Sequence, residues 1–355
     1  MPSWQGSLYA TTAQYQKELA DGLSRKNVFI AMLTENRRIT TKAGQGGEGF
    51  KWNVEVTYPT TQNIEDGQMM QRPRKNFLRQ ASLDWAYYDN INTLTERDLL
   101  KNQGKEQMTN LLKTAVTNSN KGLRDSLGQD FYLDGNTTTL RLHGAETWAG
   151  AGTALGSTGA FNPSDEYASV STVLGDLGGS APTGQYPDAT PTTPEYDAWS
   201  PLILSSTSTN FGSAGTWAAN CLTILGKASA YTARNEGSVE TVTMNAPYWH
   251  AVAQALESRE RVMVEASEKI RKYGFTKVIN YYGMDCVLDA WCPASRAYGF
   301  NWEMIELLSL FPSLFPPSEQ EKFFMDRTTT IDSRMYGQLK FVNPRANFVI
   351  KELGT

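Results

Sequence analysis

Few side chains of this sequence are suited to acid–base or nucleophilic chemistry. There are two histidines, His143 and His250, and the second lies inside a predicted helix, where a packed or solvated imidazole is the usual role. Nothing in the sequence brings either histidine to one of the three cysteines, Cys221, Cys286 and Cys292. Cys286 and Cys292 are six residues apart, which is not the short spacing of a zinc-binding pair. We therefore expect buried, unreactive thiols, no catalytic residue and no metal site.

Phosphate-binding and paired-carboxylate patterns are also missing. The glycine-rich stretch at 150–156 lacks the G-x-G-x-x-G spacing, and the stretch at 225–229 has Cys221 where a Walker loop needs its first glycine. Asp285 and Asp289 flank a predicted strand, and we interpret them as solvated residues at its ends. No cofactor is therefore expected.

Composition and charge exclude further classes. The chain has 355 residues, with 33 basic and 37 acidic side chains that give a net charge of -4, so no overall basic field predicts nucleic-acid binding. No run approaches the roughly 18 apolar residues of a membrane span, and we read no secretion signal at the N-terminus. An odd number of cysteines favours a reducing compartment.

The most informative segment is an alternating pattern between residues 46 and 92. Two runs have apolar residues at alternate positions, with Arg79 and Asp89 interrupting the second, which predicts two strands joined by a polar tip as a long ribbon. The first run is Phe50, Trp52, Val54, Val56 and Tyr58, and the second is Phe77, Ala81, Leu83, Trp85, Tyr87 and Ile91. An isolated hairpin is marginal in water, and an exposed apolar face promotes aggregation. We therefore expect this face to pack on another copy of the chain.

A basic cluster lies on the returning limb of the ribbon. It comprises Arg72, Arg74, Lys75 and Arg79, with Phe77 among them, a composition that would suit a nucleic acid. Because Glu65 and Asp66 lie at the same tip, we prefer the charged rim of a protein contact.

The rest of the chain alternates between helices and strands. We expect a short helix at 15–23, a long helix that begins with a capping box at Thr95 and stops near Gly128, and glycine-, serine- and threonine-rich loops from 143 to about 215. A strand, a helix entered through Asn245 and a second helix that ends at Gly274 follow. The chain closes with a hairpin turning at Gly283 and two strands around an Asn343-Pro344 turn.

Three stretches resemble the major capsid proteins of tailed phages with the Hong Kong 97 fold. They are "KYGFTKVINYYGMDCVLDAWCP" at 272–293, "YGQLKFVNPRANFVIKEL" at 336–353 and, more loosely, "GQYPDATPTTPEYDAWSP" at 184–201, where Pro187 stands at a position that is often glycine. The order of elements resembles this family over nearly the whole chain. The resemblance implies an α+β capsid fold with an N-terminal arm (1–45), an extended loop (46–92), a spine helix and first peripheral part (93–142), an axial domain (143–297) and a second peripheral part (298–355).

The same resemblance implies a coat protein that is not an enzyme. Its copies would form hexamers and pentamers of an icosahedral head in the virion, made in the host cytoplasm and enclosing double-stranded DNA without sequence specificity. Portal and scaffolding proteins would be partners, with cement or decoration proteins as further ones. The lysine-to-asparagine crosslink of some members is not expected, since no asparagine partner or pocket acid is marked for Lys51 or Lys75.

We predict two sets of intersubunit contact residues. The extended loop contributes Phe50, Trp52, Val54, Val56, Arg72, Arg74, Lys75 and Trp85, and the peripheral loop at 310–322 contributes Leu314, Phe315 and Pro316. Three prolines in that loop prevent a continuous helix. Its apolar residues are unusual for a loop exposed to solvent, so we expect a neighbouring subunit to cover them. Two alternatives stay open: an encapsulin-like cellular shell, and a soluble carbohydrate- or nucleotide-processing enzyme.

Overall fold

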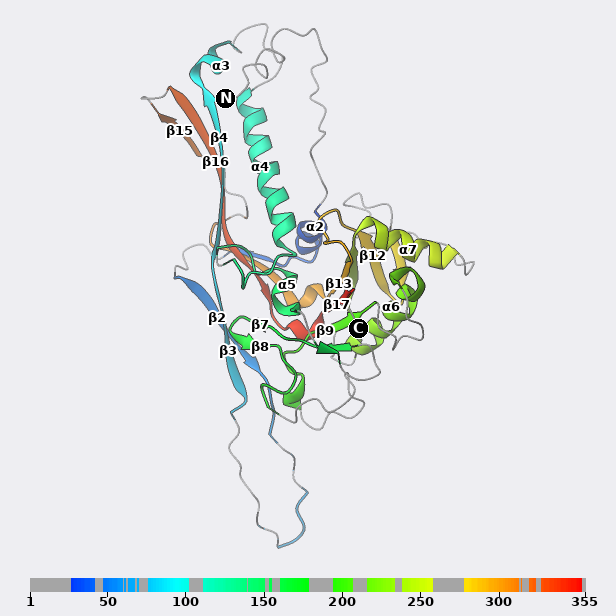
Figure 1. The fold of residues 1–355 in the computed structure, drawn as a ribbon. Helices are drawn as coiled ribbons and strands as arrows, with labels where there is room; N and C mark the ends of the chain where they lie inside the picture. The colour runs from blue at the N-terminus through cyan, green and yellow to red at the C-terminus, as the bar shows by residue number, and fades with distance from the viewer. Residues whose placement is uncertain are drawn as a thin grey trace.

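The protein is an elongated α+β molecule with two main sheets (Figure 1). The computed structural model describes residues 27–41, 47–59, 61, 63–67, 69, 76–101, 111–138, 140–150, 153–154, 160–178, 194–206, 216–233, 238–257, 278–312, 314, 319–323 and 327–352. A compact lobe lies to one side, and a long strand layer runs past it. The two-stranded ribbon of β2 and β3 extends from one end of that layer, and α3 lies at the other end (Figure 1).

The bounds of the elements are as follows. The helices are α2 (Val28–Glu35), α3 (Glu96–Lys101), α4 (Leu111–Asp130), α5 (Ala145–Ala149), α6 (Trp217–Ala233) and α7 (Ala246–Glu257), with short 3-10 turns at Pro194–Tyr196, Trp302–Met304 and Pro344–Ala346. The strands are β1 (Ile39–Thr41), β2 (Gly49–Glu55), β3 (Leu78–Asp84), β4 (Ala86–Thr95), β5 (Thr153–Ala154), β6 (Ala160–Asn162), β7 (Glu166–Tyr167), β8 (Val170–Ser171), β9 (Leu202–Ser205), β10 (Thr241–Met244), β11 (Val278–Tyr281), β12 (Met284–Leu288), β13 (Arg296–Phe300), β14 (Ile305–Ser309), β15 (Glu319–Phe323), β16 (Thr328–Phe341) and β17 (Phe348–Lys351).

The long strand layer is built on β16. The N-terminal part of β16 pairs antiparallel with β4, from Thr328 opposite Thr95 to Gly337 opposite Ala86. Its other side pairs with β15 near its start and with β14 near its end. The long helix α4 lies along β4, and the two are joined by reciprocal hydrogen bonds. The Asn90 side-chain amide donates to the Ser119 carbonyl at 2.9 Å, and the Ser119 hydroxyl donates to the Asn90 carbonyl at 2.9 Å.

The compact lobe contains an eight-stranded sheet in the order β11-β12-β10-β13-β17-β9-β6-β5. Helices α6 and α7 pack beside it through a second apolar cluster that includes Leu225, Val252 and Ile350. Strand β17 pairs with both β9 and β13, so the C-terminal segment joins strands from the middle of the chain. The predicted domain boundary at 297/298 falls within β13 itself.

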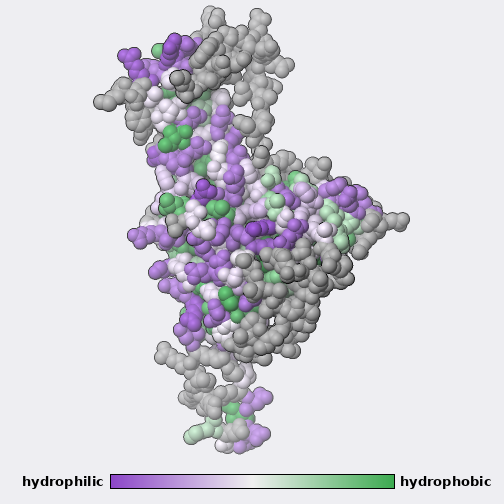
Figure 2. Space-filling model, viewed as in Figure 1, coloured by the Kyte–Doolittle hydropathy of each residue, from purple (hydrophilic) through white to green (hydrophobic). Residues whose placement is uncertain are grey.

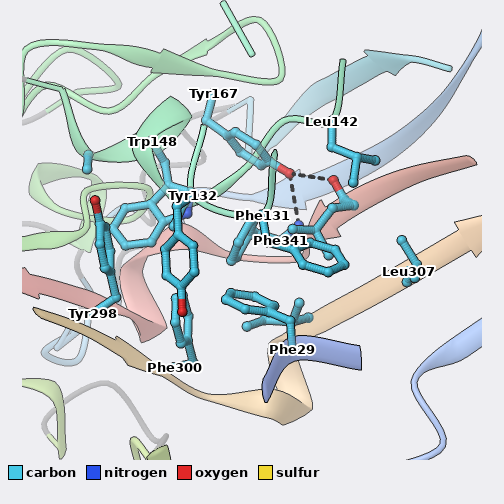
Figure 3. Close-up of a cluster of buried hydrophobic side chains, with 14 of the residues drawn as sticks. Phe29, Phe131, Tyr132, Leu142, Trp148, Tyr167, Tyr298, Phe300, Leu307 and Phe341 are labelled. Carbon is cyan, nitrogen blue, oxygen red and sulfur yellow. Dashed lines mark hydrogen bonds between the residues drawn. The ribbon is translucent and has the colours of Figure 1, made fainter. Parts of the chain in front are cut away.

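The main core lies where the two sheets and α2 meet (Figure 3). Phe29 of α2 is fully buried, and its ring centroid lies 4.8 Å from that of Phe131 and 4.6 Å from that of Phe300. The buried Tyr167 hydroxyl accepts a hydrogen bond from the Phe341 amide at 2.8 Å. Residues 28–35, which the sequence placed in an N-terminal arm, thus supply core side chains.

Several local predictions are confirmed. Thr95 caps a helix as predicted, since its hydroxyl accepts from the Asp98 amide at 3.3 Å. That helix is the short α3, which ends at Lys101, whereas the long helix α4 begins at Leu111, so a single helix from Thr95 to Gly128 is not confirmed. Gly283 has a φ of 78° in the turn between β11 and β12, and the Asn343 side chain caps the turn before β17. The long helix runs to Asp130, two residues past the predicted stop at Gly128, because the chain turns only after Phe131 enters the core. The predicted helix at 15–23 and the helix ending at Gly274 lie outside the described residues.

Candidate functional site

The predicted ribbon is present at its base. Strands β2 and β3 pair antiparallel, with Phe50 opposite Leu83 and Trp52 opposite Ala81. The returning strand passes Trp85 and continues as β4, where its partner changes from β2 to β16. The β2–β3 ribbon is therefore a direct extension of the long strand layer (Figure 1).

The apolar face of the ribbon base is covered by its own subunit. Val54 and Val56 are 7% and 3% exposed and belong to the main core, together with Ala81 and Leu83. Trp85 is also buried, with its ring 5.0 Å from that of Phe50. Since these side chains are already dry in a single subunit, the expectation that another copy covers them is corrected for Val54, Val56 and Trp85.

Phe50 and Trp52 are intermediate cases. Both are partly buried and pack against the main core, and their rings are stacked 5.5 Å apart. The Trp52 ring also lies 6.5 Å from the ring of Tyr167 and 5.3 Å from the Lys340 ammonium, a cation–π contact. Their remaining exposed edges stay available to a neighbour.

Two contacts of the lobe hold the ribbon base in place. The β7–β8 hairpin turns at Ala168 and Ser169, whose φ angles are 55° and 62°, and the Ala168 carbonyl accepts from the Ser82 amide of β3 at 2.9 Å. On the other limb, the Thr57 hydroxyl donates to the Glu195 carboxylate. The direction in which the ribbon leaves the body is therefore set by residues far away in the sequence.

Exposed apolar side chains gather toward the outer part of the ribbon. Hydrophobic and hydrophilic surfaces alternate at the far end of the molecule (Figure 2). In the segment between the paired strands, Ile64 and Met69 are 45% and 97% exposed. Tyr58, Phe77 and Leu78 are exposed nearer the base. The predicted contact residues Arg72, Arg74 and Lys75 lie outside the described residues.

The predicted peripheral loop is described only in part. Leu314 is half-buried and packs against the main core, while Phe315 and Pro316 lie outside the described residues. Next to this loop, β15 pairs with β16 along one edge.

A second exposed surface lies on the face of β4 and β16 that α4 does not cover. Tyr87 and Ile91 are exposed there, and the Tyr87 ring lies 5.4 Å from that of Tyr336. Asp89 lies among them, and its carboxyl pKa is raised by partial burial and by the nearby Asp332. The surface thus mixes aromatic and charged groups, as protein contacts do.

Sequence reasoning missed a buried charge network between α5 and the large sheet. Lys351 of β17 is 5% exposed at its side chain and donates to Glu146, whose other oxygen lies 2.7 Å from Arg296. The Tyr298 hydroxyl donates to the same carboxylate at 2.6 Å. The available signal was a lysine that directly follows the apolar run Phe348–Ile350, which is an unusual place for an unpaired charge.

The residues considered for chemistry do not converge on a site. His143 is largely buried, and desolvation lowers its imidazole pKa, whereas His250 is exposed on α7. All three cysteines are buried and free, and burial raises the pKa of the Cys286 thiol to about 12. The prediction that Asp289 is solvated is wrong. Its side chain is buried, with the residue 1% exposed, and its carboxylate accepts a hydrogen bond from the Tyr132 hydroxyl at 2.7 Å.

The described part of the chain contains no group of three or more His, Cys, Asp or Glu side chains that could hold a metal ion. Among its helices, none is both long and apolar enough to span a membrane.

The chain is similar to known proteins in structure and not in sequence. No protein-family model matches the chain, and no curated protein matches it in sequence. Among solved structures, the capsid asymmetric unit of cyanophage A-1(L) aligns with a TM-score of 0.66 at 12% identity, covering 97% of both chains. The capsid of a native GTA particle aligns with a TM-score of 0.57 at 12% identity, covering 98% of this chain and 96% of the other.

The chain has the capsid fold of tailed phages. The holo-SrpI encapsulin of Synechococcus elongatus shares this capsid fold, with a TM-score of 0.52 at 8% identity over 98% of this chain and 95% of that one.

Proposed function

We propose that this chain is a major capsid protein whose copies assemble into hexamers and pentamers of an icosahedral phage head around double-stranded DNA. The observation that carries the proposal is the alignment with a phage capsid structure over 97% of both chains. A projection with exposed apolar side chains is costly for a solitary molecule and useful to one that is covered by neighbours.

We place the intersubunit contact on the outer ribbon. Trp52 and Phe50 offer their exposed edges, and Tyr58, Ile64, Met69, Phe77 and Leu78 offer most of the exposed apolar surface. If about half of each exposed side chain is covered, each contributes roughly 1 kcal/mol, or about 5 kcal/mol for the exposed five. Association costs about 4 to 15 kcal/mol, so one ribbon contact alone is weak. Stability then comes from a closed lattice in which each subunit both gives and receives a ribbon.

Other contacts and partners follow from the same proposal. Arg72, Arg74 and Lys75 would set docking register and salt sensitivity, and Leu314, Phe315 and Pro316 would meet a neighbour at the peripheral loop. Portal, scaffolding and decoration proteins would be the partners during and after assembly in the host cytoplasm. With a net charge of -4, the lining would hold DNA weakly and without base specificity.

The test is assembly of the purified protein. The chain is expressed alone and with candidate scaffolding proteins from its genomic neighbourhood, and particles are examined by size-exclusion chromatography and negative-stain microscopy. Polyhedral shells or ring-shaped capsomers are expected. A protein that stays a small monomer under every condition would refute the proposal.

An encapsulin-like cellular shell is the second candidate, and the alignment with the holo-SrpI encapsulin favours it. The contents of shells isolated from the native source separate the two. Nuclease-protected double-stranded DNA identifies a phage head, and a packaged enzyme identifies a nanocompartment. No observation favours the soluble carbohydrate- or nucleotide-processing enzyme.

A further inference from the structure

Aspartate directly precedes glycine at three places in the sequence, which are Asp21–Gly22, Asp66–Gly67 and Asp134–Gly135. An aspartate in this position can react with its own backbone, because glycine has no side chain to shield the amide that follows the aspartate. The local structure decides whether that amide can reach the side-chain carboxyl. The first pair lies outside the described residues, and the other two have opposite surroundings.

Asp66 and Gly67 form an exposed turn in the segment between β2 and β3. The Asp66 carboxylate makes no hydrogen bond or ion pair with the described residues, and the Gly67 amide donates to none of them. Gly67 has a φ of 88°, and apart from its chain neighbours no described atom lies within 4 Å of the place where a Cβ would be. Within the described part of the chain, nothing holds the carboxyl and the amide apart.

The Asp134–Gly135 pair is held on both sides. The Gly135 amide donates to the Thr147 hydroxyl at 2.8 Å in a buried hydrogen bond, and the Asp134 carboxylate accepts from the Asn136 amide at 2.9 Å. A Cβ on Gly135 would lie 2.7 Å from the His143 ring, so the glycine is tightly packed. The Gly135 amide can react only after this structure opens locally.

We propose that Asp66–Gly67 is a spontaneous modification site, at which the folded subunit converts Asp66 to isoaspartate through a cyclic succinimide. This inference goes beyond the proposed function and does not depend on it. It makes the segment between β2 and β3 the first of these two places to change as the protein ages.

The reaction needs only water. In the first step the Gly67 nitrogen loses its proton and bonds to the side-chain carboxyl carbon of Asp66, and one carboxyl oxygen leaves as water. In the second step water opens the ring. Attack at the side-chain carbonyl restores aspartate, whereas attack at the main-chain carbonyl breaks the original peptide bond and leaves isoaspartate. One water leaves and one enters, so the mass is unchanged, while the backbone gains a methylene from the side chain.

Peptide mapping of the full-length subunit tests the proposal. Purified protein is kept in neutral buffer for several weeks, and samples taken from time zero onward are digested with trypsin, which places Asp66 and Asp134 in the separate peptides 52–74 and 125–141. The separate elution of the isobaric peptide and labelling by an isoaspartyl methyltransferase both measure isoaspartate. It should accumulate at Asp66 at least about ten times faster than at Asp134, because a buried hydrogen bond must first break at Gly135.

The same chain unfolded in guanidinium chloride is the matched control. Both pairs are then free of tertiary structure, so their rates should become similar. Asp66→Glu keeps the charge and Gly67 but would need a larger ring that closes far more slowly, and it should abolish the reaction at this position. Asp66→Asn forms the same succinimide with release of ammonia and should yield aspartate and isoaspartate, while the corresponding Asp134→Asn variant should stay intact.

Circular dichroism during the incubation establishes that the subunit and its variants remain folded. The absence of isoaspartate at Asp66, or equal rates at the two pairs in the folded subunit, would overturn the inference. A difference that persists in guanidinium chloride would overturn it as well, since flanking sequence and not the fold would be its source. Isoaspartate already at its final level at time zero would identify a product of the digestion and would also contradict the proposal. All these measurements use the subunit alone, so they do not depend on whether it forms shells.

Discussion

Removing the charge of Glu146 should destabilise the subunit more than removing the buried lysine that it binds. In Glu146→Gln, Lys351 loses its carboxylate partner while it remains almost fully buried, and Arg296 loses its partner as well. Breaking a buried pair in this way typically costs about 3 to 5 kcal/mol. Arg296 is a third exposed and can be hydrated, so Lys351 supplies most of the cost.

The protonation of Lys351 sets an upper limit to this cost. Desolvation already lowers its pKa, and Glu146 is the main group that opposes the shift. Without Glu146 the amine can release its proton, which for a lysine with a reference pKa of about 10.4 costs about 4.6 kcal/mol at pH 7. We therefore expect a loss of about 3 to 4.6 kcal/mol. In Lys351→Met, Glu146 keeps Arg296 and Tyr298, so the loss should be about 1 to 2 kcal/mol.

Urea unfolding of the unassembled subunit, followed by tryptophan fluorescence, measures both variants and the double variant. The double variant should be more stable than Glu146→Gln alone, since no buried lysine without a carboxylate partner remains. The deficit of Glu146→Gln should also shrink between pH 7 and 9. The unfolded chain then holds a proton on Lys351 that the folded variant lacks, so stability rises with pH. A larger loss for Lys351→Met than for Glu146→Gln would refute the reasoning.

Three further predictions concern stability. Trp85→Ala should lower the free energy of unfolding of the unassembled subunit by about 3 kcal/mol, measured by urea unfolding, because Trp85 is buried within its own subunit; an effect on assembly alone would contradict this. Burial lowers the pKa of His143, so wild-type stability should fall as pH drops below about 6.5, where the unfolded chain takes up the proton first. His143→Gln should lessen that fall in a pH series of thermal melts, and an unchanged slope would exclude His143 as its source. Gly122→Ala should raise the free energy of unfolding by about 1 kcal/mol in an Asn90→Ala background and by less in the wild-type background. The reason is that the new methyl group would lie 2.5 Å from the Asn90 amide nitrogen. Equal gains in the two backgrounds, measured by denaturant titration, would rule out that clash.

Local sequence chemistry determined the element boundaries that depend on neighbouring residues. The cap at Thr95, the turn at Gly283 and the turn at Asn343 each need groups within three positions along the chain. The two-residue period of the ribbon likewise predicted β2 and β3 and showed which face is apolar. Such features are encoded locally because the hydrogen bonds and the alternation of strand side chains involve near neighbours.

The tertiary structure alone decided what that apolar face packs against. Val54 and Trp85 follow the same alternating pattern as residues that a neighbouring subunit would cover. Nothing in that pattern indicates that another part of the same subunit packs against them. The hairpin at Ala168 and Ser169, more than 80 residues away, fixes the ribbon base, and Asp289 and Lys351 contact buried partners that are still more remote in sequence. Burial depends on such long-range contacts. The spacing of residues along the chain therefore predicts which face of a strand is buried. Only the folded subunit shows whether its own core or another copy buries that face.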